Sequence, residues 1–349
     1  MNGPAPIPSA DPSPSEVLLA RGQVVLAAIL WSTNGFFAKA PFFTDWPLTV
    51  EGPGGIPLPV RGPILAFWRA VFAIVILLPL VRRPSFHLVM IPMTLAFGVM
   101  CFTFLCAMTF TTEANAIWVQ NLGPTIIFAV GVSCLGEKSS AADWAALVCS
   151  TFGVLLILGC EWTWGGGASV VGLIYAFVSA LCYAGVVLGM RVLRDEDSAW
   201  LIVANHLVAV LLIGPYALYE TQAWPTLGQW VALAAFGMLQ MGAPYFLFAR
   251  AMRTISGHEA AGIGLLEPVL VPIWVWLIWS SLPTYEAPQW WTYAGAFFIL
   301  GGLVLRYTLS EKKEEEVPIA EAAAIPMPEE GADGAAKADP DPYTPPNAA

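Results

Sequence analysis

Asn121-Leu122-Gly123-Pro124-Thr125-Ile126 and Leu265-Leu266-Glu267-Pro268-Val269-Leu270 are two stretches of the chain that align with each other. Each lies inside a long apolar run and has a proline at its fourth position. Upstream, Phe97-Gly98-Val99-Met100 matches Phe236-Gly237-Met238-Leu239 in the same order. Each match is short, but their shared order predicts that the chain consists of two related halves.

Apolar runs of the same kind recur outward from these stretches along the 349-residue chain. Apolar residues make up 57% of the sequence and charged residues 11%, whereas soluble domains have about 25% charged residues. A bilayer core is crossed by roughly 20 helical residues, and an open strand in lipid would leave backbone groups unpaired. The predicted transmembrane helices are 22–43, 62–81, 88–109, 114–135, 142–160, 169–190, 199–219, 230–250, 258–280 and 289–309.

Positive charge is distributed unevenly between the two sides of the predicted membrane. With both termini in the cytoplasm, twelve Lys and Arg residues lie on that side and only Lys39 and Arg61 on the other. This is the expected bias, because positive loops are retained in the cytoplasm. It requires an even number of spans, and five spans per half make the halves run in opposite directions. We therefore expect an all-α, multi-pass protein of the cell (inner or plasma) membrane, with ten transmembrane helices as two inverted five-helix repeats.

The repeats divide the chain into four parts. Residues 1–20 are predicted to be a disordered cytoplasmic tail, 21–160 and 161–309 the two repeats, and 310–349 a disordered acidic tail. Ten of the 25 acidic residues lie in that last part, so the net charge of −10 describes the tail rather than a cargo. The N-terminus lacks the basic start and apolar core of a secretory signal. The expected partners are the lipid bilayer and a small molecule, with protons and a homodimer left open, and no nucleic acid.

No cofactor, metal or catalytic motif is found in the sequence. The six cysteines lie in apolar runs without a Cys-x-x-Cys pair, so they are expected to behave as small apolar residues. No P-loop and no HExxH motif occurs, which argues against ATP-driven pumping and against a metalloprotease. We therefore expect neither an enzyme nor a cofactor-dependent protein.

Glu267 is the most informative single residue, because it lies about halfway along the ninth predicted span. An ionised carboxylate there costs a few kcal/mol, which makes it a candidate for proton coupling. The alternative is a neutral glutamic acid that is hydrogen-bonded to a neighbouring helix. Pro268 and Pro272 follow it, and with Pro124 in the other half they are candidates for helix breaks, since proline removes a backbone donor.

Two further ionisable side chains lie within predicted spans. Arg69, in the second span, could bind a carboxylate or phosphate through its planar guanidinium, or it could extend to the membrane surface. His206, in the seventh, could titrate near neutral pH or could be a hydrogen-bonded packing residue. Glu113 lies near a helix end, which favours a solvated position at the membrane surface.

Uncharged candidates lie at similar depths. Asn34, Gln120 and Asn121 could line a substrate path, or they could form hydrogen bonds between helices. Trp31 and Trp118 could stack on an aromatic or cationic cargo, but aromatic residues in spans usually pack in the core or in the interfacial belt.

The chain resembles EamA-type members of the drug/metabolite transporter superfamily over residues 20 to 309. The resemblance rests on the ten-helix double repeat, on Thr111-Thr112-Glu113-Ala114-Asn115-Ala116, on the Gly123-Pro124 step, and on Leu135-Gly136-Glu137-Lys138. The second half departs from the pattern, with Ser280-Ser281-Leu282-Pro283-Thr284 where Gly-Glu is expected, and a Pro/Gly-rich insertion spans 47–63. Such families move amino acids, sugars, nucleotide-linked metabolites, polyamines or drugs.

The resemblance implies a secondary transporter that works by alternating access. We expect an exporter or exchanger of small polar metabolites, such as amino acids or related compounds, with its site near the midplane between the halves. Coupling to protons through Glu267 or to a counter-substrate remains open. The alternative function is that of a membrane receptor or scaffold that has kept the fold and lost transport.

Overall fold

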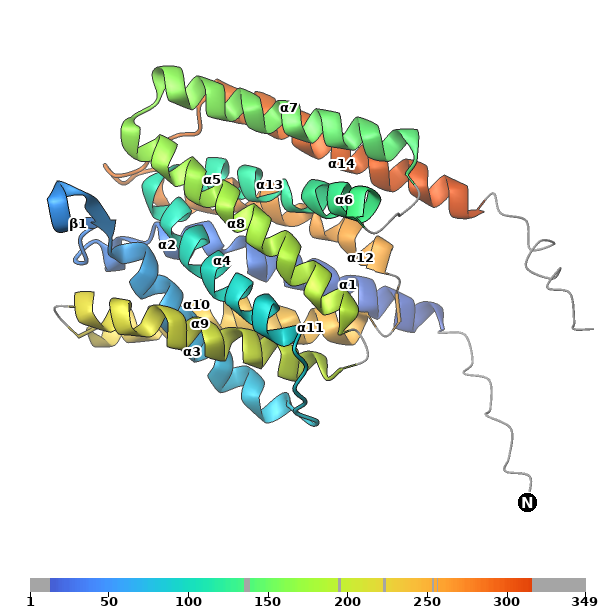
Figure 1. Cartoon of the computed structure of the whole chain (residues 1–349), viewed down its shortest axis with the longest axis horizontal. Coiled ribbons are helices and arrows are strands. Elements are labelled where there is room, and N and C mark those ends of the chain that lie inside the picture. The colour runs from blue at the N-terminus through green and yellow to red at the C-terminus, as the bar shows by residue number, and fades with distance from the viewer. Residues whose placement is uncertain are drawn as a thin grey trace, which may run out of the picture. The chain divides into compact units, whose positions relative to one another are not determined.

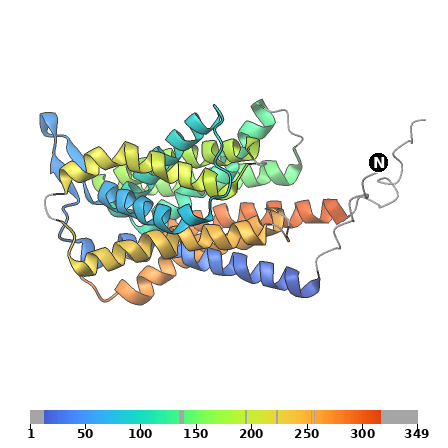
Figure 2. The same ribbon diagram turned by 90° about the horizontal axis from the view of Figure 1, so that it is seen from below.

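The computed structural model describes residues 13–134, 139–193, 196–221, 224–252, 254–255 and 257–315. Within this part, the residues up to Leu309 form one compact unit. Nine helical segments in the described part are long and apolar enough to cross a membrane. The protein is therefore a helical, multi-pass membrane protein, whose spans run roughly along one direction (Figures 1 and 2).

The helices and strands share a simple order, in which several spans consist of two consecutive helices. The elements are α1 (Pro14–Ser32), α2 (Asn34–Ala38), β1 (Thr49–Glu51), β2 (Pro57–Pro59), α3 (Arg61–Leu77), α4 (Met90–Phe110), α5 (Glu113–Gln120), α6 (Gly123–Cys134), α7 (Ala141–Trp164), α8 (Gly167–Val192), α9 (Ser198–Glu220), α10 (Leu227–Gly237), the π-helical turn η4 (Met238–Gly242), α11 (Ala243–Ala251), α12 (Gly257–Gly264), α13 (Leu266–Trp279) and α14 (Trp290–Glu315).

The predicted second to ninth spans agree with these helices within a few residues. The predicted tenth, 289–309, falls on α14, which extends beyond it to Glu315. The first prediction was wrong at its start, because α1 begins at Pro14 rather than 22. Ser13 and Glu16 form a capping box there, which satisfies two backbone donors of the first turn. Residues 14–20 are thus helical, and the rest of the predicted tails, 1–12 and 316–349, lies outside the described residues.

The insertion between the first two spans forms a β-hairpin. Strands β1 and β2 pair antiparallel, with Thr49 opposite Pro59. Gly54 and Gly55 lie between the strands with φ of 72° and 77°, a conformation that glycine adopts without steric cost. Arg61 Nε then donates to Trp46 O at 2.9 Å, which joins the hairpin to the first turn of α3. Figure 1 shows the hairpin at the end of the helices opposite to the start of α1.

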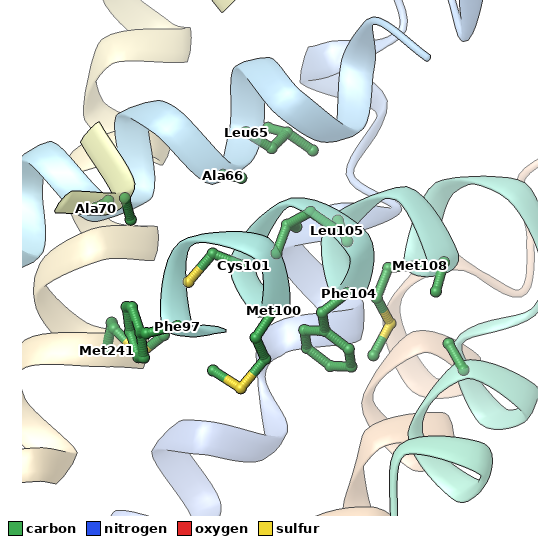
Figure 3. Packing of buried hydrophobic residues seen from close by; sticks show 14 of the residues in the cluster. Leu65, Ala66, Ala70, Phe97, Met100, Cys101, Phe104, Leu105, Met108 and Met241 are labelled. Atoms are coloured by element: carbon green, nitrogen blue, oxygen red, sulfur yellow. The ribbon is translucent and has the colours of Figure 1, made fainter. Parts of the chain in front are cut away.

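Helices α3, α4, α8 and α9 form the centre of the hydrophobic core. Small residues bring α3 and α4 close together, since a Cβ at Gly62 would lie 2.8 Å from Cys106 Cα. In Figure 3, Leu65 and Ala66 of α3 lie toward the side of α4 that carries Cys101 and Leu105. Large apolar side chains on the outer faces are exposed, such as Leu211 at 74% and Phe297 at 73%. Such surfaces suit contact with lipid rather than water.

Helix α7 packs against α14 through glycine. A Cβ at Gly153 would lie 2.5 Å from Gly295 O, and one at Gly295 would lie 2.7 Å from Gly153 O. Glycine at contacts between membrane helices allows such close backbone approach. The two helices lie side by side along one edge of the unit (Figure 1).

Candidate functional site

Two spans are broken at corresponding places of the aligned stretches. In the fourth span α5 ends at Gln120 and α6 begins at Gly123, so Asn121 and Leu122 lie outside both helices. In the ninth span α12 ends at Gly264 and α13 begins at Leu266. The alignment pairs Asn121 with Leu265, so both breaks fall at the start of the aligned segments.

Proline explains where the second helix of each pair begins. Pro124 is the second residue of α6 and Pro268 the third of α13. Proline is tolerated in the first turn of a helix, where its missing N–H has no partner to lose, but it cannot continue the preceding helix without losing a bond. Pro272 lies inside α13, so the carbonyl of Pro268, one turn before it, has no helical donor. Pro124 and Pro268 thus lie in the first turn after a break, whereas α13 continues through Pro272, so no break occurs at this third predicted position.

Glu267 is the second residue of α13 and is half-buried. Within the described part of the chain it has no hydrogen-bond or ion-pair partner, so the predicted hydrogen bond to a neighbouring helix is not found. Its electrostatic interaction is with Tyr245 of α11. A carboxyl group with this exposure and no fixed partner is free to take up or release a proton, or to contact a cargo.

Tyr245 connects several of the candidate residues, and the sequence reasoning missed it. Its ring packs edge-on against Trp31, with ring centroids 5.3 Å apart, and its centroid lies 6.5 Å from that of His206. The hydroxyl group interacts electrostatically with both Arg69 and Glu267. One phenol is therefore within electrostatic range of both the cation of α3 and the carboxyl group of α13.

Arg69 lies inside the bundle rather than at its surface, with 2% of the side chain exposed. Its Nη2 contacts Cys101 Sγ at 3.7 Å, and its guanidinium carbon lies 5.3 Å from the centre of the Phe236 ring. No carboxylate among the described residues pairs with it. The predicted alternative, extension to the membrane surface, is therefore not observed.

His206 is fully buried on α9, the helix that packs against α3, which carries Arg69. Its Nδ1 lies 2.8 Å from Ile202 O, and its Nε2 has no partner among the described residues. A carbonyl only accepts, so Nδ1 carries the proton and Nε2 presents a lone pair in the neutral ring. The ring lies 4.8 Å from that of Phe97. One ring nitrogen of His206 is thus hydrogen-bonded and the other is not.

The uncharged candidates do not all meet at one place. Gln120 Nε2 donates to Ser179 Oγ of α8 at 2.8 Å, so it forms a hydrogen bond between helices, one of the two alternatives. Asn121 Nδ2 bonds to Ile117 O within its own turn. Asn34 is buried at the start of α2, and its Oδ1 has no partner within the described residues. Trp118 is buried on α5. Of the two tryptophans, Trp31 is the one whose ring packs against Tyr245.

A π-helical turn in the eighth span was not predicted. Segment η4 separates α10 from α11, and π-helical turns occur frequently at functional sites. Gln240 in this turn donates from Nε2 to Trp31 O at 3.2 Å, and its Oε1 has no partner among the described residues. The sequence signal was the Gly242-Ala243-Pro244 step within the predicted span 230–250.

Glu113 corrects a second expectation, because it is 2% exposed instead of solvated. It interacts electrostatically with Lys39, which follows α2 and donates from Nζ to Thr111 O at 2.7 Å. Burial lowers the pKa of Lys39, and the charges of Glu113 and Glu286 act in the opposite direction. The start of α5 is therefore held inside the protein by a charged side chain of the first span.

Two apolar cavities are lined by described residues, and one of them borders the first break at Leu122. One of about 190 Å³ opens between α6 and α7 and is lined by residues that include Leu122, Ile126 and Leu147. The other, of about 330 Å³, is lined by residues that include Met90 and Trp200. Neither is lined by a charged side chain, so they suit lipid chains better than a polar cargo.

Comparison with known proteins gives a consistent assignment. Residues 170–308 match the EamA-like transporter family. An uncharacterized transporter of Bacillus subtilis, YxxF, is 23% identical over 56% of this chain and 61% of its own length. The chain thus spans less than two thirds of that relative. An uncharacterized transporter of Archaeoglobus fulgidus is 26% identical over 70% of this chain and 82% of its own.

A solved crystal structure has the same fold, with a TM-score of 0.57 at 18% identity, over 84% of this chain and 99% of that one. The apolar spans, the broken helices and these matches agree with the resemblance found in the sequence. The chain is therefore a multi-pass membrane protein whose residues 170–308 match the EamA-like transporter family and which is similar to uncharacterized transporters of two organisms.

Proposed function

We propose that the chain is a secondary active transporter that exports or exchanges small polar metabolites, such as amino acids or related compounds, by alternating access. In this proposal ten transmembrane helices form two inverted repeats, 21–160 and 161–309, in the cell membrane with both termini in the cytoplasm. The cargo binds near the midplane, between the repeats. The twelve-to-two distribution of Lys and Arg supports the orientation.

The observation that carries the proposal is the pair of matching helix breaks, at Asn121-Leu122 and at Leu265. Non-helical backbone at membrane depth is tolerated only where protein surrounds it or where it lines a water-filled cavity. In inverted-repeat transporters such broken helices form the substrate and ion sites. Two breaks at aligned positions support one site formed by both halves.

Glu267 is the proposed coupling group within this site. It lies next to the second break, is half-buried and has no fixed partner among the described residues. A carboxyl group in this position could bind a proton on one side of the membrane and release it on the other, because the exposure of the site alternates. Exchange of two substrates would need no such group.

Flux into proteoliposomes tests the proposal. The full chain is reconstituted, and uptake of a labelled amino-acid mixture is measured with and without an imposed pH gradient. We expect uptake that responds to the gradient in the unmodified protein and loses this response in Glu267→Gln. Glu51→Gln, which changes an exposed carboxylate of the hairpin, is the matched control and should behave as the unmodified protein.

Each other outcome has a defined meaning. Uptake that ignores the gradient would reject proton coupling and leave exchange in place. A folded protein without flux of any amino acid, nucleoside, sugar or cationic drug would reject transport and favour the receptor or scaffold function.

A further inference from the structure

Arg69 is a buried cation without a counter-charge among the described residues. Its polar contact is the sulfur of Cys101 at 3.7 Å, and Phe236 covers one face of the guanidinium. Moving an ion out of water removes favourable solvation, even after the protein relaxes. One weak sulfur acceptor and one cation–π contact do not replace that solvation. The side chain is therefore incomplete without an anion.

The contacts of Arg69 are with an aromatic ring and a sulfur atom, those of Phe236 and Cys101. Figure 3 shows Cys101 and Phe97 on one stretch of α4, and the ring of Phe97 packs against that of His206 with centroids 4.8 Å apart. His206 adds a buried Nε2 that has no partner within the described residues. A cation without a counter-charge and an imidazole nitrogen without a partner thus lie on adjoining helices, and both residues are almost completely buried.

The backbone holds Arg69 firmly in place. A Cβ at Gly237 would lie 2.6 Å from Arg69 O and 2.4 Å from Phe72 Cβ, so α10 contacts the main chain of α3 directly at this level. The π-helical turn follows immediately. The guanidinium is therefore presented by a rigid helix contact rather than by a flexible loop.

We propose that Arg69 is the anion-binding group of the substrate site and that the transported compound carries a carboxylate that pairs with it. This inference rests on the proposed transport function. A carboxylate fits because its two oxygens match the planar guanidinium and its single charge equals that of Arg69. A phosphate ester carries up to two charges, and no second cation contacts Arg69 among the described residues.

Tyr245 places this anion site in the same region as Glu267. Its hydroxyl interacts with both groups, so a cargo whose carboxylate is bound by Arg69 extends toward Tyr245 and Trp31. Arg69 is almost inaccessible in this structure, which therefore represents a closed arrangement of the site. Alternating access exposes it.

Ligand-induced stabilisation of the purified full chain tests the inference, with benzoate as the probe. Benzamide, which has the same shape without the charge, is the matched ligand control. We expect benzoate to raise the melting temperature in a saturable way and benzamide to have no comparable effect. In Arg69→Lys, which keeps the charge and loses the planar guanidinium, the apparent Kd for benzoate should increase at least tenfold. Arg250→Lys makes the same change at an exposed arginine, and there the apparent Kd should stay the same.

Equal stabilisation by benzoate and benzamide, no response to millimolar benzoate, or an unchanged Kd in Arg69→Lys would each overturn the inference. Arg69→Met serves as a second variant, and the lysine variant decides if the methionine variant does not fold. The two proposals fail separately. Binding of benzoate without flux in proteoliposomes would reject transport and keep the anion site. Flux without Arg69-dependent binding would reject the anion site and keep transport.

Discussion

Asn115 Nδ2 donates to Glu161 Oε1 at 2.6 Å, so a buried carboxylate of α7 is held by the first turn of α5. Trp291 Nε1 donates to the same oxygen at 3.2 Å, and Thr292 Oγ1 of α14 donates to Asn115 Oδ1 at 2.6 Å. Asn115 and Glu161 are both almost fully buried. Satisfied polar networks in a low-dielectric interior make the surrounding packing rigid, so this one ties three spans together near the start of α5.

Replacing Asn115 tests the network. Asn115→Ala leaves the carboxylate with only Trp291 and leaves Thr292 without its acceptor, so we expect the protein to lose about 2 kcal/mol of stability. Thermal denaturation in detergent measures this loss. Thr163→Ala is the control, because its hydroxyl is exposed and bonds within its own helix. In combination with Thr292→Val the two losses should be less than additive, and additive losses would show that the residues act independently.

The α7–α14 contact predicts opposite effects for two glycines of one helix. Gly153→Ala places a methyl group 2.5 Å from the backbone oxygen of Gly295, which cannot move without separating the helices. Overpacking of this kind costs about 1–3 kcal/mol and outweighs the gain of about 1 kcal/mol in helix propensity. Gly159→Ala meets nothing within 4 Å and keeps that gain. Melting temperatures should therefore fall for Gly153→Ala and rise for Gly159→Ala, and a rise in both would reject the close contact.

Much of the fold could be predicted from the sequence, because the hydrophobic thickness of the bilayer fixes the length of each span. The positions of the two main breaks could also be predicted, since proline acts locally and the repeat places Pro124 and Pro268 at matching positions. The start of α1 was missed because a capping box at Ser13 and Glu16 extends the helix into a region whose composition is polar.

Less of the candidate site could be predicted, because it depends on contacts between distant helices. Glu267, Arg69 and His206 stand out as ionisable residues in apolar runs. Tyr245 does not, since a tyrosine in a span is ordinary until its neighbours are known. Glu161 falls just beyond the predicted fifth span, 142–160, so nothing in the sequence distinguished it from a solvated residue before Asn115 and Trp291 were found beside it.

Asp197 gives a pH-dependent contribution to stability outside the spans. Burial raises the pKa of Asp197. Hydrogen bonds from the backbone N–H groups of Arg83, Arg82, Trp200 and Ala199 lower this pKa by more than burial raises it, so it lies below the ordinary 3.8. A carboxylate whose pKa is lowered by folding stabilises the folded state at pH values above its pKa in the unfolded chain. This stabilisation is lost as the pH falls through the pKa of the folded state. The bonds join the α3–α4 loop to the start of α9.

Asp197→Asn should therefore melt at a lower temperature than the unmodified protein at pH 7. The difference should shrink as the pH falls below about 4, the ordinary pKa of an aspartate in the unfolded chain, and on through the lower pKa of Asp197 in the folded protein. Melting curves between pH 7 and pH 3 measure both values. Asp45→Asn, at an aspartate in the loop before the hairpin, is the control. A difference that stays constant over this range would show that the charge is not the stabilising factor.

Gly123 links the first break to the candidate site through Tyr183 of α8. A Cβ at Gly123 would lie 2.5 Å from Tyr183 Cδ1, so Gly123→Ala must displace this ring. Tyr183 interacts electrostatically with Tyr245, which also interacts with Arg69 and Glu267, so displacement of the Tyr183 ring changes the surroundings of Tyr245.

We expect Gly123→Ala to lower transport by about tenfold, the effect of 1.4 kcal/mol, while the protein still folds, because a ring can shift where a backbone cannot. Gly185→Ala on α8 is the matched control. Its Cβ would meet only Ala96 Cβ at an ordinary 3.8 Å, so its flux should not change. Flux in proteoliposomes and melting temperature are measured for both variants. If Gly123→Ala keeps full flux, Tyr183 does not shape the site, and the first break acts only as a bend between α5 and α6.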